Sequence, residues 1–161
     1  MIKVITIGAI GYTADTFFQA LQDAGVDTLC DVRQRRAVRG HDYVFANSQR
    51  LQARLADLGI RYLHRGDLAP TDAARASQAA ADKAGGVATR KRTELSPAFI
   101  EAYKRDVLAR FDPQTLLDDL PPGAAVVALM CVEREPAACH RSLLAERLRS
   151  TWGVEVQHLT P

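Results

Sequence analysis

The chain is poor in cysteine, in aromatic residues and in net charge. Only three of its 161 residues are cysteine, 6% are aromatic, and the formal net charge is +2. Three cysteines do not make a disulfide framework, and a chain of this length buries roughly 70% of its unfolded surface without one. The core therefore needs neither disulfides nor a structural metal, and we expect free thiols in a reducing cytoplasm.

Long apolar runs are also missing. Residues 124–132 form an apolar run of about nine residues, whereas a membrane helix requires roughly twenty. The apolar start, Met1–Gly8, lacks a small-residue cleavage site and leads directly into glycines. We therefore expect a cytoplasmic protein without a membrane partner.

The small positive charge permits nucleic-acid binding without requiring it. A dedicated duplex binder has a stronger basic bias than a net charge of +2. Basic residues nevertheless form two local clusters, Arg33, Arg35, Arg36 and Arg39 in the first and Arg90, Lys91 and Arg92 in the second. Such clusters are usually solvated, but they keep nucleic acid a candidate partner.

Strand-like and helix-like segments alternate along the chain. Apolar runs of strand length occupy residues 3–8, 26–32, 60–64, 124–131 and 154–158. Helices are predicted over 13–24, from 47 or 48 to 58, from 96 to Asp112-Pro113, over 115–120 and over 139–151. This order predicts a single α/β domain over residues 1–161, a three-layer α/β/α arrangement with a mostly parallel sheet of about five strands.

The segment 67–93 differs from the rest of the chain. It is rich in Ala, Asp and Lys and contains Gly85-Gly86. We expect a surface excursion that is partly helical and partly mobile, because long insertions without a clear apolar pattern are often lids or disordered segments. The segment is therefore a candidate lid over a site.

Polar residues follow all five predicted strands, at the edge where an open parallel sheet binds ligands. In chain order they are Thr6 and Gly8, Asp31 and Arg33, His64 and Asp67, Cys131 and Glu133, and His158. Because the carboxyl ends of parallel strands share one edge, we expect these residues to lie near one another. The sequence thus predicts a functional site there.

The densest cluster lies between the fourth strand and the last helix. Cys131 and Glu133 end the strand, and Cys139-His140-Arg141 opens the helix. A thiol in a first helical turn gains thiolate character from the helix dipole and from neighbouring positive charge. We predict catalytic roles for Cys131, Glu133, Cys139 and His140, with either cysteine as the nucleophile.

An anionic ligand fits the remaining polar groups of this edge, because helix amides and guanidinium groups hold anions. We expect ligand contacts from Thr6, Gly8, Asp31, Arg33, His64 and Arg141. For Asp31 and Arg33, a buried salt bridge that fixes the loops is an equal alternative.

Neither a metal site nor a cofactor is expected. The cluster offers suitable ligand types, but C-x7-C-H is not a usual zinc spacing. The positive charge of Arg141 next to the site would also oppose a cation. We therefore assign no residue to metal binding.

Five short stretches form a distinctive set: Thr6-Ile7-Gly8, Asp31-Val32-Arg33, residues 59–64, residues 129–133 and Cys139-His140-Arg141. With its strand ending C-x-E and the following C-H-R, the chain resembles domain of unknown function 488, a bacterial and archaeal family, over about residues 2–159. The resemblance implies an α/β fold and a site, but no reaction.

The chain departs from the common pattern of that family in two loops. Gly8-Ala9-Ile10 stands where the family commonly has G-H-S, and Leu68-Ala69-Pro70 stands in place of L-G-G. The loss of that histidine and those glycines argues against phosphate contacts from these two loops.

The leading functional hypothesis is an enzyme that binds an anionic small molecule or nucleotide, with Glu133 and His140 for proton transfer. The first alternative is a non-catalytic nucleic-acid or nucleotide binding module that uses the arginine clusters. Another is a structural role, in which the Cys-Glu and Cys-His-Arg residues form a buried bracing network. Asp31-Val32-Arg33 also resembles an element of rhodanese sulfurtransferases, so sulfur transfer is a further alternative, by analogy of topology alone.

Overall fold

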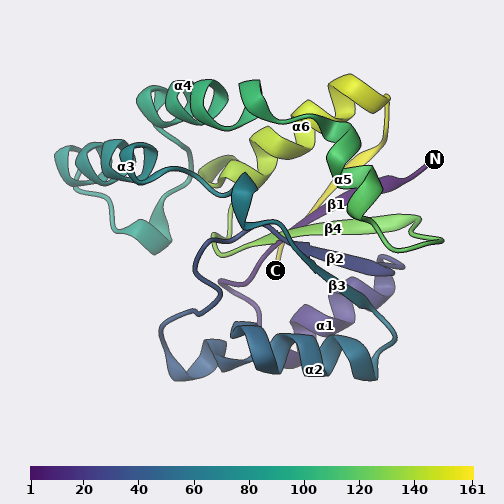
Figure 1. Cartoon of the computed structure of the whole chain (residues 1–161). Coiled ribbons are helices and arrows are strands. Elements are labelled where there is room, and N and C mark those ends of the chain that lie inside the picture. Colours follow the sequence, from purple (N-terminus) through teal and green to yellow (C-terminus); the bar gives the residue numbers. More distant parts are fainter.

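Five strands form one parallel sheet in the computed structural model, which describes all 161 residues (Figure 1). The strands are β1 (Lys3–Gly8), β2 (Thr28–Asp31), β3 (Arg61–His64), β4 (Val126–Cys131) and β5 (Val156–Leu159). Their order across the sheet is β3-β2-β4-β1-β5, and every neighbouring pair is parallel. The predicted α/β class with a mostly parallel sheet is confirmed.

Six α-helices connect the strands, together with short 3-10 turns. They are α1 (Ala14–Asp23), α2 (Ser48–Asp57), α3 (Asp72–Ala84), α4 (Pro97–Asp106), α5 (Pro113–Asp119) and α6 (His140–Trp152). Side chains at the helix starts explain the boundaries: Thr13 accepts from the Thr16 amide and Ser96 from the Phe99 amide. None of the helices combines the length and the apolar character that a membrane span requires.

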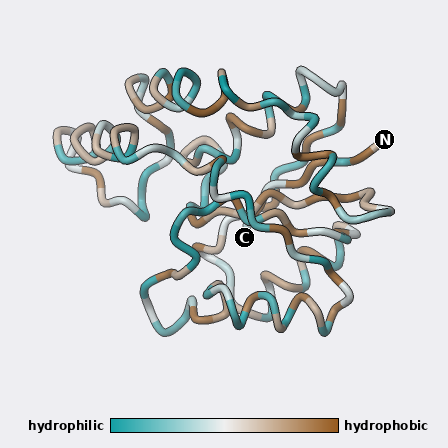
Figure 2. The backbone as a smooth tube through the Cα atoms, viewed as in Figure 1, coloured by the Kyte–Doolittle hydropathy of each residue, from teal (hydrophilic) through white to brown (hydrophobic).

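Helices cover both faces of the sheet and complete the three layers (Figure 1). On one face, α1 and α2 pack their buried side chains against β1; the group includes Phe17, Leu21, Leu51, Leu55, Ile5 and Ile7. On the other face, α4, α5 and α6 pack against β4; that group includes Tyr103, Leu116, Leu144, Val127 and Leu129. Figure 2 shows hydrophobic stretches along the central strands, and hydrophobic and hydrophilic residues alternating along the helices.

The segment 67–93 contains a regular helix, α3, that packs against α4. Gln78 and Asp82 of α3 are buried and hydrogen-bonded to each other at 2.8 Å. Gln78 also accepts a hydrogen bond of 2.9 Å from the backbone amide of Ser96, which caps α4. These polar contacts hold α3 in place without the apolar stripe that helices usually bury.

The connections that leave β2 and β4 run to opposite faces of the sheet. β2 leads into α2, and its neighbour β4 leads into α6 on the other face. In an open parallel sheet such a divergence opens a crevice at the carboxyl ends of the two strands. The topology therefore places a cleft between the loop after Asp31 and the loop after Cys131.

Candidate functional site

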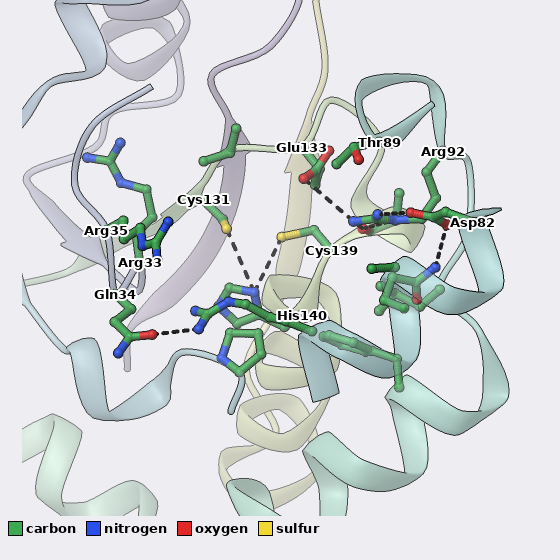
Figure 3. Close-up of a pocket in the computed structure, with 18 of the residues that line it drawn as sticks. Arg33, Gln34, Arg35, Asp82, Thr89, Arg92, Cys131, Glu133, Cys139 and His140 are labelled. Atoms are coloured by element: carbon green, nitrogen blue, oxygen red, sulfur yellow. Dashed lines mark hydrogen bonds and ion pairs between the residues drawn. The ribbon is translucent and has the colours of Figure 1, made fainter. Parts of the chain in front are cut away.

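A pocket of about 410 Å³ lies at this crevice (Figure 3). Its volume falls in the range of roughly 300–1,000 Å³ that is typical of small-molecule sites. The walls come from three segments: the loop after β2, the stretch from α3 to the start of α4, and the stretch from the end of β4 to the start of α6. The lining residues labelled in Figure 3 are Arg33, Gln34, Arg35, Asp82, Thr89, Arg92, Cys131, Glu133, Cys139 and His140.

Two thiols converge on one imidazole at the wall of the pocket. Cys131 is the last residue of β4, Cys139 directly precedes α6, and His140 is the first residue of that helix. The sulfur atoms of Cys131 and Cys139 lie 3.7 Å and 3.6 Å from Nδ1 of His140. All three residues are buried, and their ligand atoms lie within 4.8 Å of one another.

The orientation of the His140 ring is fixed from two sides. Its Nε2 lies 3.1 Å from the backbone carbonyl oxygen of Val32, which can only accept a hydrogen bond. The neutral ring therefore carries its proton on Nε2 and presents the lone pair of Nδ1 to the two thiols. Tyr103 packs edge-on against the ring at 5.4 Å and donates its own hydroxyl to the Leu68 carbonyl.

The two thiols differ in their electrostatics. Burial opposes ionisation of Cys139, but the hydrogen bond from Cys131 and the positive charges of a protonated His140 and of Arg141 lower its pKa well below the usual thiol value. The same hydrogen bond, together with burial, raises the pKa of Cys131 well above that value. Cys139 is thus the more acidic member of the pair.

Glu133 faces the pocket beside a buried ion-pair network. Its Oε1 lies 3.5 Å from Arg92, whose guanidinium also bonds to Asp82 at 2.8 Å and to the carbonyl oxygen of Ala138. Burial raises the pKa of Glu133 to about 7, with Arg92 acting in the opposite direction. The side chain is therefore a carboxyl group at the pocket wall with Arg92 as its one ion-pair partner.

Arg33 lines the pocket and is held from behind by Asp31. The Nε and Nη2 atoms of Arg33 each donate to a different oxygen of Asp31 at 2.8 Å, and Tyr62 donates to the same carboxylate. His64 does not line the pocket; its Nε2 lies 2.8 Å from the Arg33 carbonyl. The Nη1 atom of Arg33 is buried without a hydrogen-bond partner.

Besides Asp31 and His64, three further predicted ligand contacts lie outside the pocket. Arg141 is fully buried and donates from Nη1 to the Glu133 carbonyl at 2.6 Å. Gly8 packs against that same carbonyl group. Thr6 is buried in β1, with its hydroxyl 2.7 Å from Nδ1 of His158 on β5. The pocket therefore contains Cys131, Glu133, Cys139, His140 and Arg33 of the predicted set, but not Thr6, Gly8, Asp31, His64 or Arg141.

Sequence reasoning names the segment 67–93 as a candidate lid but misses the α3 residues that line the pocket. Gln78 and Asp82 both line it, and Asp82 anchors Arg92. The Ala-rich sequence shows no apolar stripe and therefore predicts a surface excursion rather than a pocket wall. The spacing of Gln78 and Asp82, four residues apart on one helical face, was the signal available.

One protein-family model matches the chain. The model described as "Domain of unknown function DUF488" matches residues 13–148. Searches of curated proteins and of solved structures gave no match. The matched range includes the loops after β2 and β4 and most of α6, whereas β1 and β5 lie outside it. Because the match covers well over half of its length, the chain belongs to the family of the domain of unknown function DUF488.

Proposed function

We propose that the protein is an enzyme that acts on an anionic small molecule, with a nucleotide as the candidate substrate. One observation carries the proposal: a ligand-sized pocket has two thiols, an imidazole and a carboxyl group on its wall. Clusters of reactive and titratable groups in a concave site are typical of catalysis. A role limited to bracing the fold would not require these groups to line a pocket.

The charge of the pocket favours an anion. Asp82 and Glu133 are engaged by Arg92, and Asp31 behind the wall engages two of the three guanidinium nitrogens of Arg33. The remaining nitrogen of Arg33 has no protein partner, and a buried donor without a partner is costly. A phosphate or carboxylate oxygen of the substrate would satisfy it.

Catalysis in this proposal belongs to Cys131, Glu133, Cys139 and His140. Two chemistries start from these groups. In the first, the Cys139 thiolate attacks the substrate directly; in the second, the cysteines and the histidine hold a metal ion. In both, Glu133 carries a proton, because its carboxyl group lines the pocket and its only ion-pair partner is Arg92 at 3.5 Å.

The test combines binding and turnover. We expect the wild-type protein to bind adenosine 5′-monophosphate or inorganic phosphate in calorimetric titrations, and to convert at least one member of a panel of mononucleotides and phosphate esters, followed by mass spectrometry. Glu133→Gln should abolish turnover and keep binding, whereas Arg33→Met should weaken binding. Arg105→Gln, an exposed arginine paired with Asp106 outside the pocket, is the matched control. Absence of binding by the wild type for all of these probes would overturn the proposal.

A second candidate function is non-catalytic binding of single-stranded nucleic acid. Arg90 of the second basic cluster donates to the carbonyl oxygen of Arg39 in the first cluster at 2.6 Å. Its guanidinium also lies 5.3 Å from the ring centre of Tyr43. This contact joins the two clusters into one basic surface, and such surfaces follow a phosphate backbone.

This candidate predicts steeply salt-dependent binding of an oligonucleotide that survives substitution of Cys131 and Cys139. Fluorescence anisotropy with a labelled single strand at several salt concentrations measures it. We expect an Arg39→Ala/Arg90→Ala variant to lose affinity and salt dependence together. A flat salt response of the wild type would remove this candidate and leave the enzyme proposal untouched.

A further inference from the structure

The two thiols beside His140 share a single acceptor nitrogen. Nε2 is occupied by the Val32 carbonyl, so Nδ1 offers a single lone pair. Cys131 and Cys139 both point at that atom, at nearly equal distances of 3.7 Å and 3.6 Å (Figure 3). One lone pair cannot accept from two thiols in good geometry, whereas an ion between the three atoms would satisfy all of them.

We propose that Cys131, Cys139 and His140 bind one Zn²⁺ ion whose fourth coordination position opens into the pocket. In a tetrahedral zinc site, Zn–S bonds of about 2.3 Å and Zn–N bonds of about 2.0–2.1 Å place sulfur and nitrogen roughly 3.6 Å apart. The two sulfur–nitrogen distances have this value within 0.1 Å. Two thiolates and an imidazole are also a donor set that suits zinc.

The surroundings of His140 are those of a metal ligand. A ligating imidazole usually donates its other N–H to a carbonyl or carboxylate, which fixes the tautomer and the ring plane. The Val32 carbonyl accepts that hydrogen bond, and the Tyr103 ring packs against the imidazole. The lone pair of Nδ1 is therefore aimed at the two sulfur atoms before any ion arrives.

No fourth protein ligand joins this cluster. The carboxylates that line the pocket, including Glu133 and Asp82, lie outside the group of converging ligand atoms. Closed structural zinc sites have four protein ligands, whereas catalytic sites have three and leave one position for water or substrate. Since all three ligands line the pocket, the open position faces the space that a substrate would occupy.

Two features of the sequence argue against a metal: the C-x7-C-H spacing and the positive charge of Arg141. Neither one opposes an ion in the folded chain. Cys139 is extended, with φ −139° and ψ 145°, immediately before α6 begins, and this brings its sulfur and the ring of its neighbour His140 to one point. Arg141 is directed away, to the Glu133 carbonyl. Two thiolates also neutralise the charge of Zn²⁺, so Arg141 meets no net positive charge.

The catalytic role that we assign to this ion rests on the proposed enzymatic function. Zinc activates a bound water molecule as a nucleophile near neutral pH. Water then adds to the substrate, one of its protons passes through Glu133 to the leaving group, and R–X plus H₂O becomes R–OH plus H–X without any redox change. In zinc-dependent nucleobase deaminases a glutamate that is not a ligand carries the proton. Glu133 has the matching place, two residues after Cys131.

The experiment measures metal binding separately from turnover. The reduced protein is freed of metal with a chelator and titrated with Zn²⁺ and with Co²⁺. We expect one ion per chain, and for Co²⁺ the thiolate charge-transfer band and the visible bands of tetrahedral coordination. Cys131→Ser, Cys139→Ser and His140→Ala should each lower the affinity by more than about 100-fold, since even outer ligand partners contribute 10–100-fold. Cys30→Ala is the matched control, because Cys30 is equally buried but lies outside the cluster.

Thermal unfolding of the wild type keeps the proposal testable if a variant does not fold. Zinc should raise the unfolding temperature of the folded wild type and of Cys30→Ala, because a ligand stabilises the state that binds it. A folded, reduced wild-type protein that takes up no Zn²⁺ or Co²⁺ would overturn the metal site, as would full affinity in Cys139→Ser. A protein that binds zinc but converts no nucleotide would overturn only the enzyme proposal. Turnover unaffected by complete metal removal would overturn the catalytic role of the ion and favour the Cys139 thiolate as the nucleophile.

Discussion

Gly8 at the end of β1 lies in direct contact with the backbone carbonyl of Glu133. A Cβ atom at position 8 would overlap that carbonyl oxygen and would lie 2.9 Å from Nη1 of Arg141. The same guanidinium nitrogen donates to the carbonyl oxygen at 2.6 Å. Gly8 therefore sets how closely the Glu133 loop folds over the sheet, and this contact fixes the backbone at one wall of the pocket.

Substitution of Gly8 by alanine should push this loop outward. Because the neighbours of the new methyl group are a backbone carbonyl and a buried arginine, we expect a loss of about 1–3 kcal/mol in the free energy of unfolding, typical of overpacking. Urea denaturation measures it. Gly85→Ala is the control: its φ is −86° and the nearest atom to an added Cβ is 3.4 Å away. Equal losses at both glycines would contradict the proposed role of Gly8.

The buried pair of Asp31 and Arg33 leads to a second prediction. Asp31 has no solvent exposure, and its two carboxylate oxygens hold the guanidinium that lines the pocket. Asp31→Asn keeps the shape but removes the charge, so Arg33 remains buried as an uncompensated cation. Removing one partner of a buried pair costs about 3–5 kcal/mol.

Calorimetric unfolding of Asp31→Asn tests this expectation, and Asp106→Asn is its control. Asp106 pairs with Arg105 at the surface, where an ion pair contributes little, so that variant should unfold like the wild type. If Asp31→Asn proved as stable as Asp106→Asn, the carboxylate would not be what holds Arg33 in the pocket wall.

Local patterns in the sequence predicted the class of the fold well. Apolar periodicity and helix caps are local properties, and they gave every strand to within about two residues. β2 begins at Thr28 rather than at residue 26, although the backbone N–H of Asp27 still donates to the Val126 carbonyl and its carbonyl accepts from the Arg61 amide. The strand order was not predictable, since it depends on packing between segments far apart in the chain.

The candidate site was predictable only in part, because some of its contacts also join segments far apart in the chain. Cys139 and His140 are neighbours in sequence, and Cys131 precedes them by one loop, so their clustering follows from the β4–α6 connection. Thr6 and His158 instead bond to each other, because the parallel register of β1 and β5 places them side by side. The Val32 carbonyl that orients His140 has no signature in the sequence, because a backbone group acts through its position alone.

Acid stability provides a third prediction, at the end of the sheet opposite the pocket. Burial would raise the pKa of Asp27, but hydrogen bonds from Thr28 and from the amides of Val126 and Ala125 outweigh it and lower this pKa. In the unfolded chain the value is about 3.9. The stabilisation is therefore fully present above that pH and is lost as the pH falls through the lower pKa of the folded state.

Asp27→Asn should remove this contribution. We expect the variant to be less stable than the wild type by about 1–2 kcal/mol near neutral pH, as for lost hydrogen bonds to a charged group. The difference should shrink as the pH falls below about 4. Urea denaturation across this pH range measures it, with the exposed Asp57→Asn as the control. A difference that stays constant down to the most acidic samples would show that the carboxylate charge is not responsible.

The last prediction concerns Gln78, which ties α3 to the rest of the protein. Its amide donates to Asp82 at 2.8 Å and its oxygen accepts from the Ser96 amide at 2.9 Å. Few apolar side chains of α3 are buried, so these bonds should determine how often the helix opens. Gln78→Ala leaves buried groups unpaired, which lowers the free energy of local opening by about 1–3 kcal/mol. The rate of amide hydrogen exchange in α3 should therefore rise roughly 5–150-fold.

Hydrogen exchange followed by mass spectrometry measures this opening peptide by peptide. Faster exchange should be confined to α3 and the start of α4, while β1 and β4 keep their protection, because the sheet does not depend on Gln78. Ser77→Ala, one residue away on the same helix, is the control; the Ser77 hydroxyl bonds only to the helix's own Ala73 carbonyl. Confined opening would make α3 a pocket wall that moves independently of the sheet, as a lid must. A rise spread evenly over all strands would instead show that α3 unfolds only with the whole protein, and the lid interpretation would then be wrong.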